Sequence, residues 1–195
     1  MKVTIFMLSA LLLVGCAHSI NITPSFREIA IDDNLIQTPV GYYISTVDRE
    51  KKTEQKTSGG DSIIFNPYME LEPGIQKVLF DRFRVVRILT SSPTPNALKD
   101  AHVKLAFIPE FTTETISSGF FTWPPRKFAV KCSIRAVGPD GKVIWSQTYE
   151  GVGEAGDNEI YNDFGIAAKR AAEDAFKKFA RDLHSTKVFS SVGGT

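Results

Sequence analysis

The chain has 195 residues, and its 23 Lys and Arg residues nearly balance its 22 Asp and Glu residues, for a formal net charge of +1. This balance gives no overall attraction to nucleic acid or to anionic lipid, so no nucleic-acid partner is expected. The length suffices for one domain with a hydrophobic core, and two cysteines are too few for the disulfide framework of a small secreted scaffold.

The N-terminus carries an apolar run over residues 3–14, behind the single charge of Lys2. About a dozen apolar residues suit the central region of a signal peptide and are short for a transmembrane helix, which needs about 20. The run ends in Leu13-Val14-Gly15-Cys16, which resembles a bacterial lipoprotein signal. The resemblance implies that residues 1–15 are removed and that Cys16 receives a covalent lipid, with no other cofactor. The alternatives are a secretory signal with an incidental cysteine and a buried N-terminal helix.

Sorting of such a lipoprotein depends on the residue after the cysteine, which here is Ala17. In the enterobacterial lipoproteins that this signal resembles, Asp at that position means retention at the inner membrane. Ala17 therefore predicts a lipid-anchored protein of the bacterial cell envelope, at the outer membrane and facing the periplasm. Acylation of Cys16 leaves Cys132 without a partner in the chain. The alternating pattern around Cys132 predicts a buried apolar thiol.

The first half of the mature chain predicts a tether, a strand, a polar mobile loop, a helix and a second strand. The tether covers residues 17–38, the first strand 40–47, the loop 48–61, the helix 67–82 and the second strand 83–89. The loop contains Gly59-Gly60, and Pro73 is close enough to the start of the helix to lie in its first turn.

The second half predicts a loop, a short turn of helix, three strands and a long final helix. The loop covers residues 90–96 and the short turn of helix 97–101. The three strands cover residues 102–112, 128–136 and 142–151, and the final helix covers 162–184. A long connection over 113–126 precedes the second of these strands, and Gly138-Pro139-Asp140-Gly141 is a strong hairpin signal. The alanines of the final helix allow close approach to a sheet. A loose tail follows, in which Val188 and Phe189 can dock.

This order of elements predicts an α+β fold: a single mixed or antiparallel sheet of about five strands, with two main helices packed on one face. One domain is expected over residues 39–185. The removed leader (1–15), the lipidated N-terminus and tether (16–38) and the C-terminal tail (186–195) complete the chain.

Three segments carry a resemblance to a known group of domains: the helix–strand unit over Glu72–Leu89, the hairpin return over Asp140–Trp145 and the alanine-rich final helix. Together they resemble the small periplasmic domain shared by the N-terminal region of TolB, the YajG type, the penicillin-binding-protein activator LpoB and the polysaccharide-export lipoprotein PelC. The resemblance covers residues 40–184 and implies a bacterial envelope lipoprotein.

The ionisable residues do not form a catalytic or metal-binding motif. His18, His102 and His184 fall in the tether, at a strand start and at a helix end. None of the spacings HExxH, CxxC and GxSxG occurs, so no catalytic residue and no metal ligand is predicted. An enzyme would need carboxylates to converge, for example those of Glu110, Glu114 and Glu154.

Two loops could in principle bind an ion. Gly59-Gly60-Asp61-Ser62 could cradle an anion, but the Lys-Ser/Thr sequence of a phosphate loop does not follow it, and a flexible loop is favoured. Glu154, Asp157 and Glu159 could bind a cation, but their spacing does not match an EF-hand. A solvated turn with helix-capping residues is the preferred interpretation.

The connection between two of the strands contains clustered aromatic residues, Phe120, Phe121 and Trp123. Such a cluster is costly to expose, so it packs on its own domain, meets the membrane interface or contacts a partner. We favour a protein contact, because the lipid on Cys16 already supplies the anchor.

These observations lead to three hypotheses on function. The first is a membrane-anchored, non-catalytic accessory or assembly factor for an envelope complex in export or cell-wall synthesis. It would have envelope protein partners and could form a homo-oligomer. The second is a periplasmic binding module that holds a lipid or another apolar ligand between sheet and helix. An enzyme, the third, is disfavoured because no catalytic pattern is present.

Overall fold

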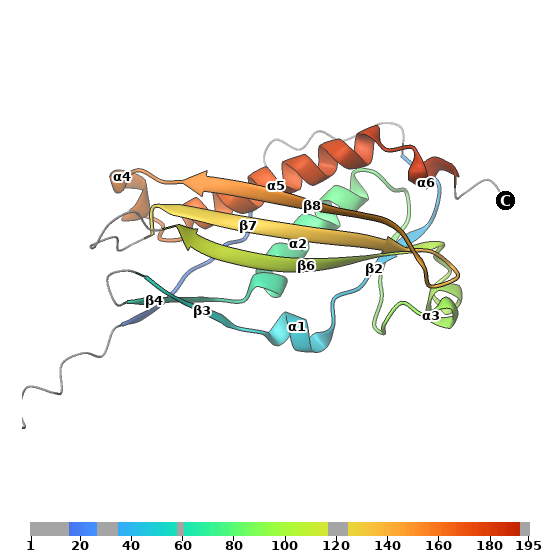
Figure 1. Cartoon of the computed structure of the whole chain (residues 1–195), viewed down its shortest axis with the longest axis horizontal. Coiled ribbons are helices and arrows are strands. Elements are labelled where there is room, and N and C mark those ends of the chain that lie inside the picture. Colours follow the sequence, from blue (N-terminus) through green and yellow to red (C-terminus); the bar gives the residue numbers. More distant parts are fainter. Residues whose placement is uncertain (1–15, 27–34, 58–60, 117–124, 192–195) are drawn as a thin grey trace, which may run out of the picture.

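The computed structural model describes residues 16–26, 35–57, 61–116 and 125–191 (Figure 1). Its largest element is a five-stranded sheet in the order β5-β2-β6-β7-β8. The strands are β2 (Val40–Tyr42), β5 (Val86–Ile88), β6 (Leu105–Ile116), β7 (Lys127–Val137) and β8 (Val143–Glu154). β2 pairs in parallel with both β5 and β6, and β6, β7 and β8 form an antiparallel meander.

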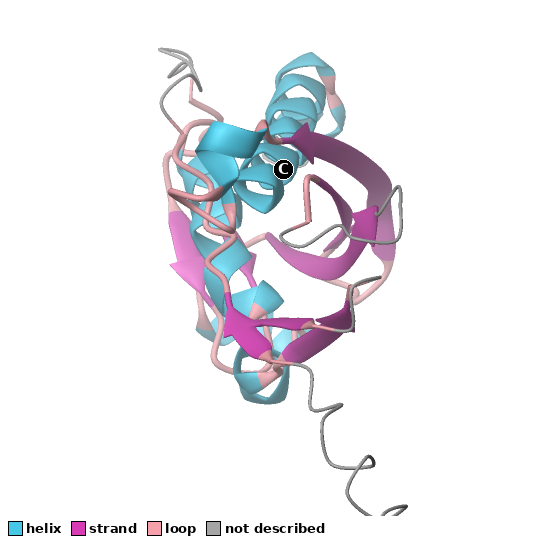
Figure 2. Ribbon diagram, turned by 90° about the vertical axis from the view of Figure 1, so that its left-hand side faces the viewer, coloured by secondary structure: helices cyan, strands magenta, loops and turns pink. Residues whose placement is uncertain are grey.

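Two long helices, α2 (Pro67–Phe80) and α5 (Ile166–Ser185), contact one another and pack on one face of this sheet. α2 begins with Pro67, whose fixed φ suits a first helical residue, and it buries Leu71, Ile75, Val78 and Leu79. In α5, an apolar face of alanines and phenylalanines turns to β7 and β8. The strands curve around these helices (Figure 2). The α+β class and the two main helices are therefore confirmed.

A second sheet departs from the predicted single sheet. It has the order β1-β4-β3, with β1 (Ala17–Ser19), β3 (Thr53–Lys56) and β4 (Ser62–Phe65). β1 pairs in parallel with β4, and β3 pairs with β4 antiparallel. Phe65 packs edge-on against Phe128 of β7, with ring centroids 5.8 Å apart, so both sheets share one core.

The segment expected to be a tether is largely built into the domain. Ile20 and Ile22 lie in the core, and the Ile22 N–H donates to the Glu70 carboxylate of α2 at 2.7 Å. Ile36 is also buried and bridges Phe83. The stretch is polar overall, so its sequence did not indicate that Ile20, Ile22 and Ile36 are buried. Their burial depends on contacts with residues that are distant in the chain. Residues 27–34 lie outside the described part of the chain.

The polar stretch predicted as one mobile loop instead contains α1 (Thr46–Glu50) and strand β3. Ser45 caps α1, since its side chain accepts a hydrogen bond from Asp48 N at 3.0 Å. β3 exists because β4 pairs with it, and polar Thr-Glu-Gln-Lys has no strand signature of its own. The Gly59-Gly60 pair lies outside the described residues.

The remaining elements are short helices around the ends of the sheet. They are α3 (Pro95–Asp100), α4 (Asp157–Ile160) and α6 (Val188–Ser191). α6 lies in the predicted tail, and its Phe189 is fully buried against Phe83, Phe107 and Trp145, at centroid distances of 5.3 to 5.9 Å. Docking of Phe189 is thus confirmed, and the tail is not loose over these residues.

Candidate functional site

Cys16 is exposed and lies directly at the edge of the small sheet. Its N–H donates to Asp61 Oδ1 at 3.0 Å, and its carbonyl accepts from Ser62 N at 2.9 Å. The next residue already belongs to β1 and pairs with Ser62. An N-acylated cysteine keeps one amide hydrogen, so the bond to Asp61 is compatible with acylation. The thiol is therefore accessible while its backbone is held by the domain.

The second cysteine has a different environment. Cys132 is fully buried in the core, and this burial raises the pKa of its thiol. A neutral, enclosed thiol has little reactivity, as predicted for this position.

β1, which follows Cys16 directly in the chain, lies at one end of the long axis of the molecule (Figure 1). The same end carries α4, the C-terminal end of β6 and the start of β7. The predicted aromatic contact residues Phe120, Phe121 and Trp123 lie outside the described residues. The strands that flank them end at Ile116 and begin at Lys127, so the connection covers residues 117–126 and is four residues shorter than the predicted one over 113–126.

The acidic residues at this end are paired with basic side chains. Three ion pairs join Glu154 to Lys127 at 2.6 Å, Asp157 to Arg126 at 2.5 Å and Glu159 to Arg170 at 2.5 Å. Hydrogen bonds from Arg170 and from Gly156 N lower the pKa of Glu159 to about 2. In residues that the structure describes, no group of three or more His, Cys, Asp or Glu side chains is placed to hold a metal ion.

The carboxylates that an enzyme would need are spread along the sheet. Glu110 pairs in register with Ser133, Glu114 with Ala129 and Glu154 with Lys127, so each lies at a different level of the meander. The histidines are equally dispersed. His18 is in β1, His102 follows α3 and His184 is in the last turn of α5.

A half-buried polar cluster links β2, α1 and α2. Glu72 accepts from Tyr42 Oη at 2.7 Å and from Arg49 Nε at 2.9 Å, and Gln76 Nε2 donates to Tyr42 Oη at 2.6 Å. Burial alone would raise the pKa of Glu72, but the hydrogen bonds from Arg49 and Tyr42 outweigh it and lower that pKa. Burial and the bond to Glu72 raise the pKa of Tyr42. The cluster has paired donors and acceptors throughout, which is typical of a structural role.

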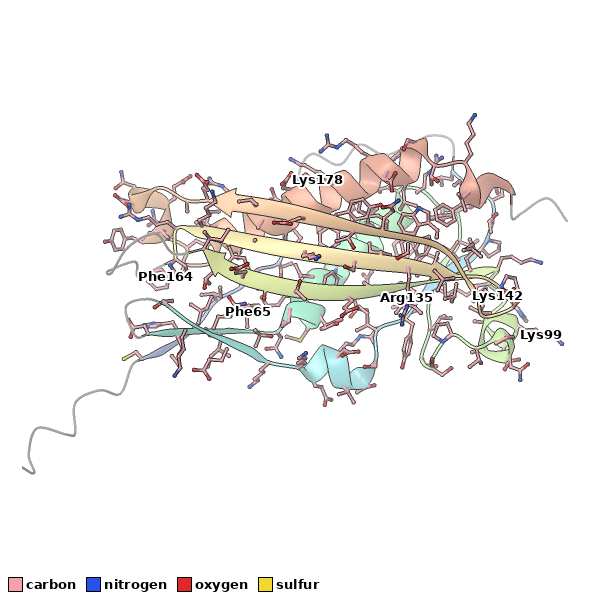
Figure 3. All side chains as sticks on the ribbon, in the orientation of Figure 1. Phe65, Lys99, Arg135, Lys142, Phe164 and Lys178 are labelled. Atoms are coloured by element: carbon pink, nitrogen blue, oxygen red, sulfur yellow. The ribbon has the colours of Figure 1, made fainter. Side chains whose placement is uncertain are left out.

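A pocket of about 580 Å³ lies at the other end of the molecule. Its apolar wall is formed by Pro39, Pro95, Leu98, Val103 and Pro139. Its basic groups are Lys99, His102 and Lys104, and none of the described residues that line it is a carboxylate. Figure 3 labels Lys99 at this end, and Phe164 at the end that carries Cys16.

His102 has an unusual backbone in this pocket. Its φ is 55°, in the left-handed region that favours glycine, and its Nδ1 donates to the carbonyl of Lys99 at 2.9 Å. The position follows the C-terminus of α3, where glycine is the usual residue. The sequence analysis missed this pocket, because its lining comes from three separate parts of the chain, Pro39, residues 95–104 and Pro139, and only the Pro139 hairpin carried a local signal.

Within the described residues, none of the helices combines the length and apolar character needed to cross a bilayer. No protein-family model matches the chain, and no curated protein matches it.

Several solved structures are similar to the chain. A Xanthomonas campestris protein of a family of unknown function has 11% identity and a TM-score of 0.46, over 90% of this chain and 95% of that one. A candidate lipoprotein from Caulobacter crescentus has 14% identity and a TM-score of 0.35, over 64% of this chain and 82% of that one. A PelC dodecamer from Paraburkholderia phytofirmans has 11% identity and a TM-score of 0.41, over 74% and 94%. At these identities and TM-scores, none of the similarities supports a statement about the family or function of this chain.

Proposed function

We propose that this chain is a lipid-anchored lipoprotein of the bacterial envelope that acts as a non-catalytic accessory or assembly factor for an envelope complex. The observation that carries the proposal is the exposed Cys16 behind its lipoprotein-like signal, at one end of a folded domain. The covalent lipid is its only cofactor. Ala17 favours the outer membrane, with the domain in the periplasm.

Anchoring is the mechanism of the proposed role. A diacylglyceryl group together with an N-acyl chain gives more than one buried acyl chain, which suffices for stable membrane attachment. Attachment raises the effective concentration of the domain near membrane partners, including further copies of the chain. The resemblance to TolB-, YajG-, LpoB- and PelC-like domains agrees with such a role in export or cell-wall machinery.

Replacement of the acceptor thiol tests the anchor. The full chain is expressed in a bacterial host and its envelope is fractionated, with mass spectrometry of the N-terminal peptide. We expect wild-type chain in the membrane fraction with a lipidated Cys16, and Cys16→Ser in the soluble fraction or with an uncleaved leader. Cys132→Ala is the matched control and should fractionate like wild type. An unmodified wild-type Cys16 would contradict the proposal.

The accessory role is tested on the aromatic residues of the β6–β7 connection. Phe121→Ser/Trp123→Ser in the lipidated chain should stay in the membrane fraction, since Cys16 is unchanged. We expect crosslinking and pull-down from the native envelope to recover fewer partners with this variant than with wild type. If oligomeric state, solubility and co-purifying proteins are all unchanged, the loop makes no such contact.

The pocket favours a second candidate function, a binding module for a small amphipathic anion. A volume of about 580 Å³ lies within the range of ligand sites, roughly 300 to 1,000 Å³. The apolar wall suits an acyl chain, and Lys99 and Lys104 suit a carboxylate or phosphate head. This pocket is at the end of the sheet, and not between sheet and helices as the sequence predicted. Sheet and helix are in direct contact at β8 and α5, where a Cβ on Gly151 would lie 2.0 Å from the carbonyl oxygen of Ala171.

Decanoate is a suitable probe, with decanol as its uncharged counterpart. We expect calorimetry to detect decanoate binding, and Lys99→Ser/Lys104→Ser to weaken it by about tenfold towards the affinity of decanol. Lys142→Ser is the matched control, because Lys142 pairs with Asp140 on the nearby hairpin and does not line the pocket. Equal affinities for decanoate and decanol would rule out an anion site.

His102→Gly separates binding from stability. Glycine adopts a left-handed φ without steric cost, so this variant is expected to be at least as stable as wild type. Removal of the imidazole should still weaken decanoate binding. If binding is unchanged, His102 is not part of the site.

A further inference from the structure

Two exposed aromatic side chains lie in the turn between α4 and α5. Tyr161 is 73% exposed, the highest value for any Phe, Tyr or Trp among the described residues, and Phe164 is 37% exposed. Exposed aromatics of this size are unusual unless they meet a partner or a membrane. Their position near the proposed anchor favours the membrane over a protein partner.

This turn is packed against the chain that leads away from Cys16. The rings of His18 and Phe164 meet edge-on, with centroids 6.4 Å apart. Gly165 approaches so closely that a Cβ there would lie 2.0 Å from the carbonyl oxygen of Asn21. Cys16 and His18 are two positions apart along the chain, a rise of about 7 Å in a strand. The Phe164 ring, which meets the His18 ring, is therefore within about 20 Å of the lipid attachment point.

The backbone around Cys16 is fixed as well. Its hydrogen bonds to Asp61 and Ser62 leave no flexible linker between the acylated residue and the domain. An acyl chain in the bilayer must therefore bring this end of the domain to the membrane surface. The headgroup layer is about 5 to 8 Å thick on each side of the hydrocarbon core, so nearby side chains reach it.

The charges around the turn are paired with each other. Lys169 contacts Asp163 at 2.7 Å, and the three ion pairs described above link the remaining elements at this end. Paired charges remain hydrated in a headgroup layer and require no anionic lipid. Contact with the bilayer is thus expected to rest on the aromatic rings, which favour the membrane–water interface.

We propose that Tyr161 and Phe164 lie in the interfacial layer of the bilayer that holds the lipid of Cys16. The domain then stands end-on, with its long axis close to the bilayer normal and α3 farthest from the membrane. The inference rests on the proposed lipidation of Cys16 and adds to it a fixed orientation. A lipid surface is the occupant, because the turn is continuous with the anchored residue.

Depth-dependent quenching tests this orientation in the lipidated protein. An environment-sensitive thiol probe is placed at Tyr161→Cys, or at Asp100→Cys on exposed α3 as the matched distal control, both in a Cys132→Ala background. The protein is inserted into phosphatidylcholine vesicles that contain headgroup- or acyl-labelled quencher lipids. We expect quenching at position 161 to exceed that at position 100 at least threefold. Tyr161→Ser/Phe164→Ser should remain bound and show increased quenching at position 100.

The outcomes separate the two proposals. A wild-type chain whose Cys16 carries no lipid and which does not sediment with vesicles contradicts the lipoprotein assignment itself. A lipidated, vesicle-bound chain with equal quenching at positions 161 and 100 overturns only the end-on orientation. Shielding of position 161 in the native envelope without quenching in vesicles assigns this turn to a protein contact and likewise overturns it.

Discussion

Ile22 shows at the scale of one residue how the segment behind Cys16 is held. Its side chain is fully buried, and its N–H is bound to Glu70 of α2. Three residues later, Ser25 N donates to Glu173 of α5 at 2.8 Å, and the Phe26 ring lies 5.9 Å from that of Phe176. The segment thus contacts both main helices. The lipid proposed on Cys16 is therefore attached to a segment that packs on the core.

Truncation of Ile22 tests whether the segment is structural. Ile22→Ala removes a buried side chain and should lower the free energy of unfolding by about 2 to 5 kcal/mol. Ser19→Ala, an exposed change in the same segment, should alter it by less than about 0.5 kcal/mol. Urea denaturation measures both. Equal stability of the two variants would restore the interpretation of this segment as a free tether.

At the scale of elements, β8 and α5 pack backbone against backbone. A Cβ on Gly151 would lie 2.0 Å from the carbonyl oxygen of Ala171, and one on Gly153 would lie 2.0 Å from that of Ala167. Glycines on the strand and alanines on the helix let the two backbones touch. The alanine-rich face predicted from the sequence therefore has a matching glycine face on the strand.

The same helix also covers the outer edge of β8. Arg170 donates to the carbonyl of Glu154 at 2.7 Å, Asp174 accepts from Val152 N at 3.2 Å, and Lys178 donates to the carbonyl of Glu150 at 2.7 Å. These side chains occupy backbone groups that another strand would need. Assembly of several copies by strand addition is thus blocked over Glu150–Glu154.

Gly151→Ala tests the helix–strand contact. The new methyl group meets helix backbone, which cannot rotate away, so the free energy of unfolding should fall by about 2 to 3 kcal/mol or more. Gly156→Ala is the control, because the nearest atom to its Cβ is the flexible carboxylate of Glu159 at 3.6 Å. It should cost less than about 1 kcal/mol. Thermal and urea unfolding measure the stability of both variants. Similar losses of stability in Gly151→Ala and Gly156→Ala would disprove so close a contact between β8 and α5.

At the scale of the whole molecule, β1, which follows the proposed anchor, and α3, which contributes residues to the pocket, lie at opposite ends of the long axis (Figure 1). In the end-on orientation the pocket faces away from the bilayer. Changes at the two ends share no contacts and should act independently. Cys16→Ser is therefore expected to change fractionation while it leaves decanoate affinity unchanged, and His102→Gly is expected to do the reverse. A shift of both properties by either variant would argue against separate sites.

Long elements with strong periodicity could be predicted from the sequence. The final helix, the alternating strand around Cys132 and the hairpin with Gly141 all form, the last with a φ of 76° at Gly141. Each of these has a pattern that repeats over many residues or requires one special backbone conformation. Local chemistry is then enough to predict it.

Short elements could not be predicted in this way. β1, with three residues, and β3, with four, are strands only because β4 lies between them. Their polar residues provide no alternation and no apolar face. Periodicity in the sequence therefore predicted neither the second sheet nor the burial of Ile20 and Ile22.

The sequence by itself determined the signal-like N-terminus with Cys16 as the proposed lipid acceptor, the α+β class and the two main helices, because these depend on composition and spacing along the chain. Only the tertiary structure decided that Cys16 is held by Asp61, that Phe164 meets His18 of the neighbouring strand, and that Lys99, His102 and Lys104 line one pocket. These are contacts between residues far apart in the chain. They exist because packing of the core brings separate segments together, and no local pattern encodes which segments meet.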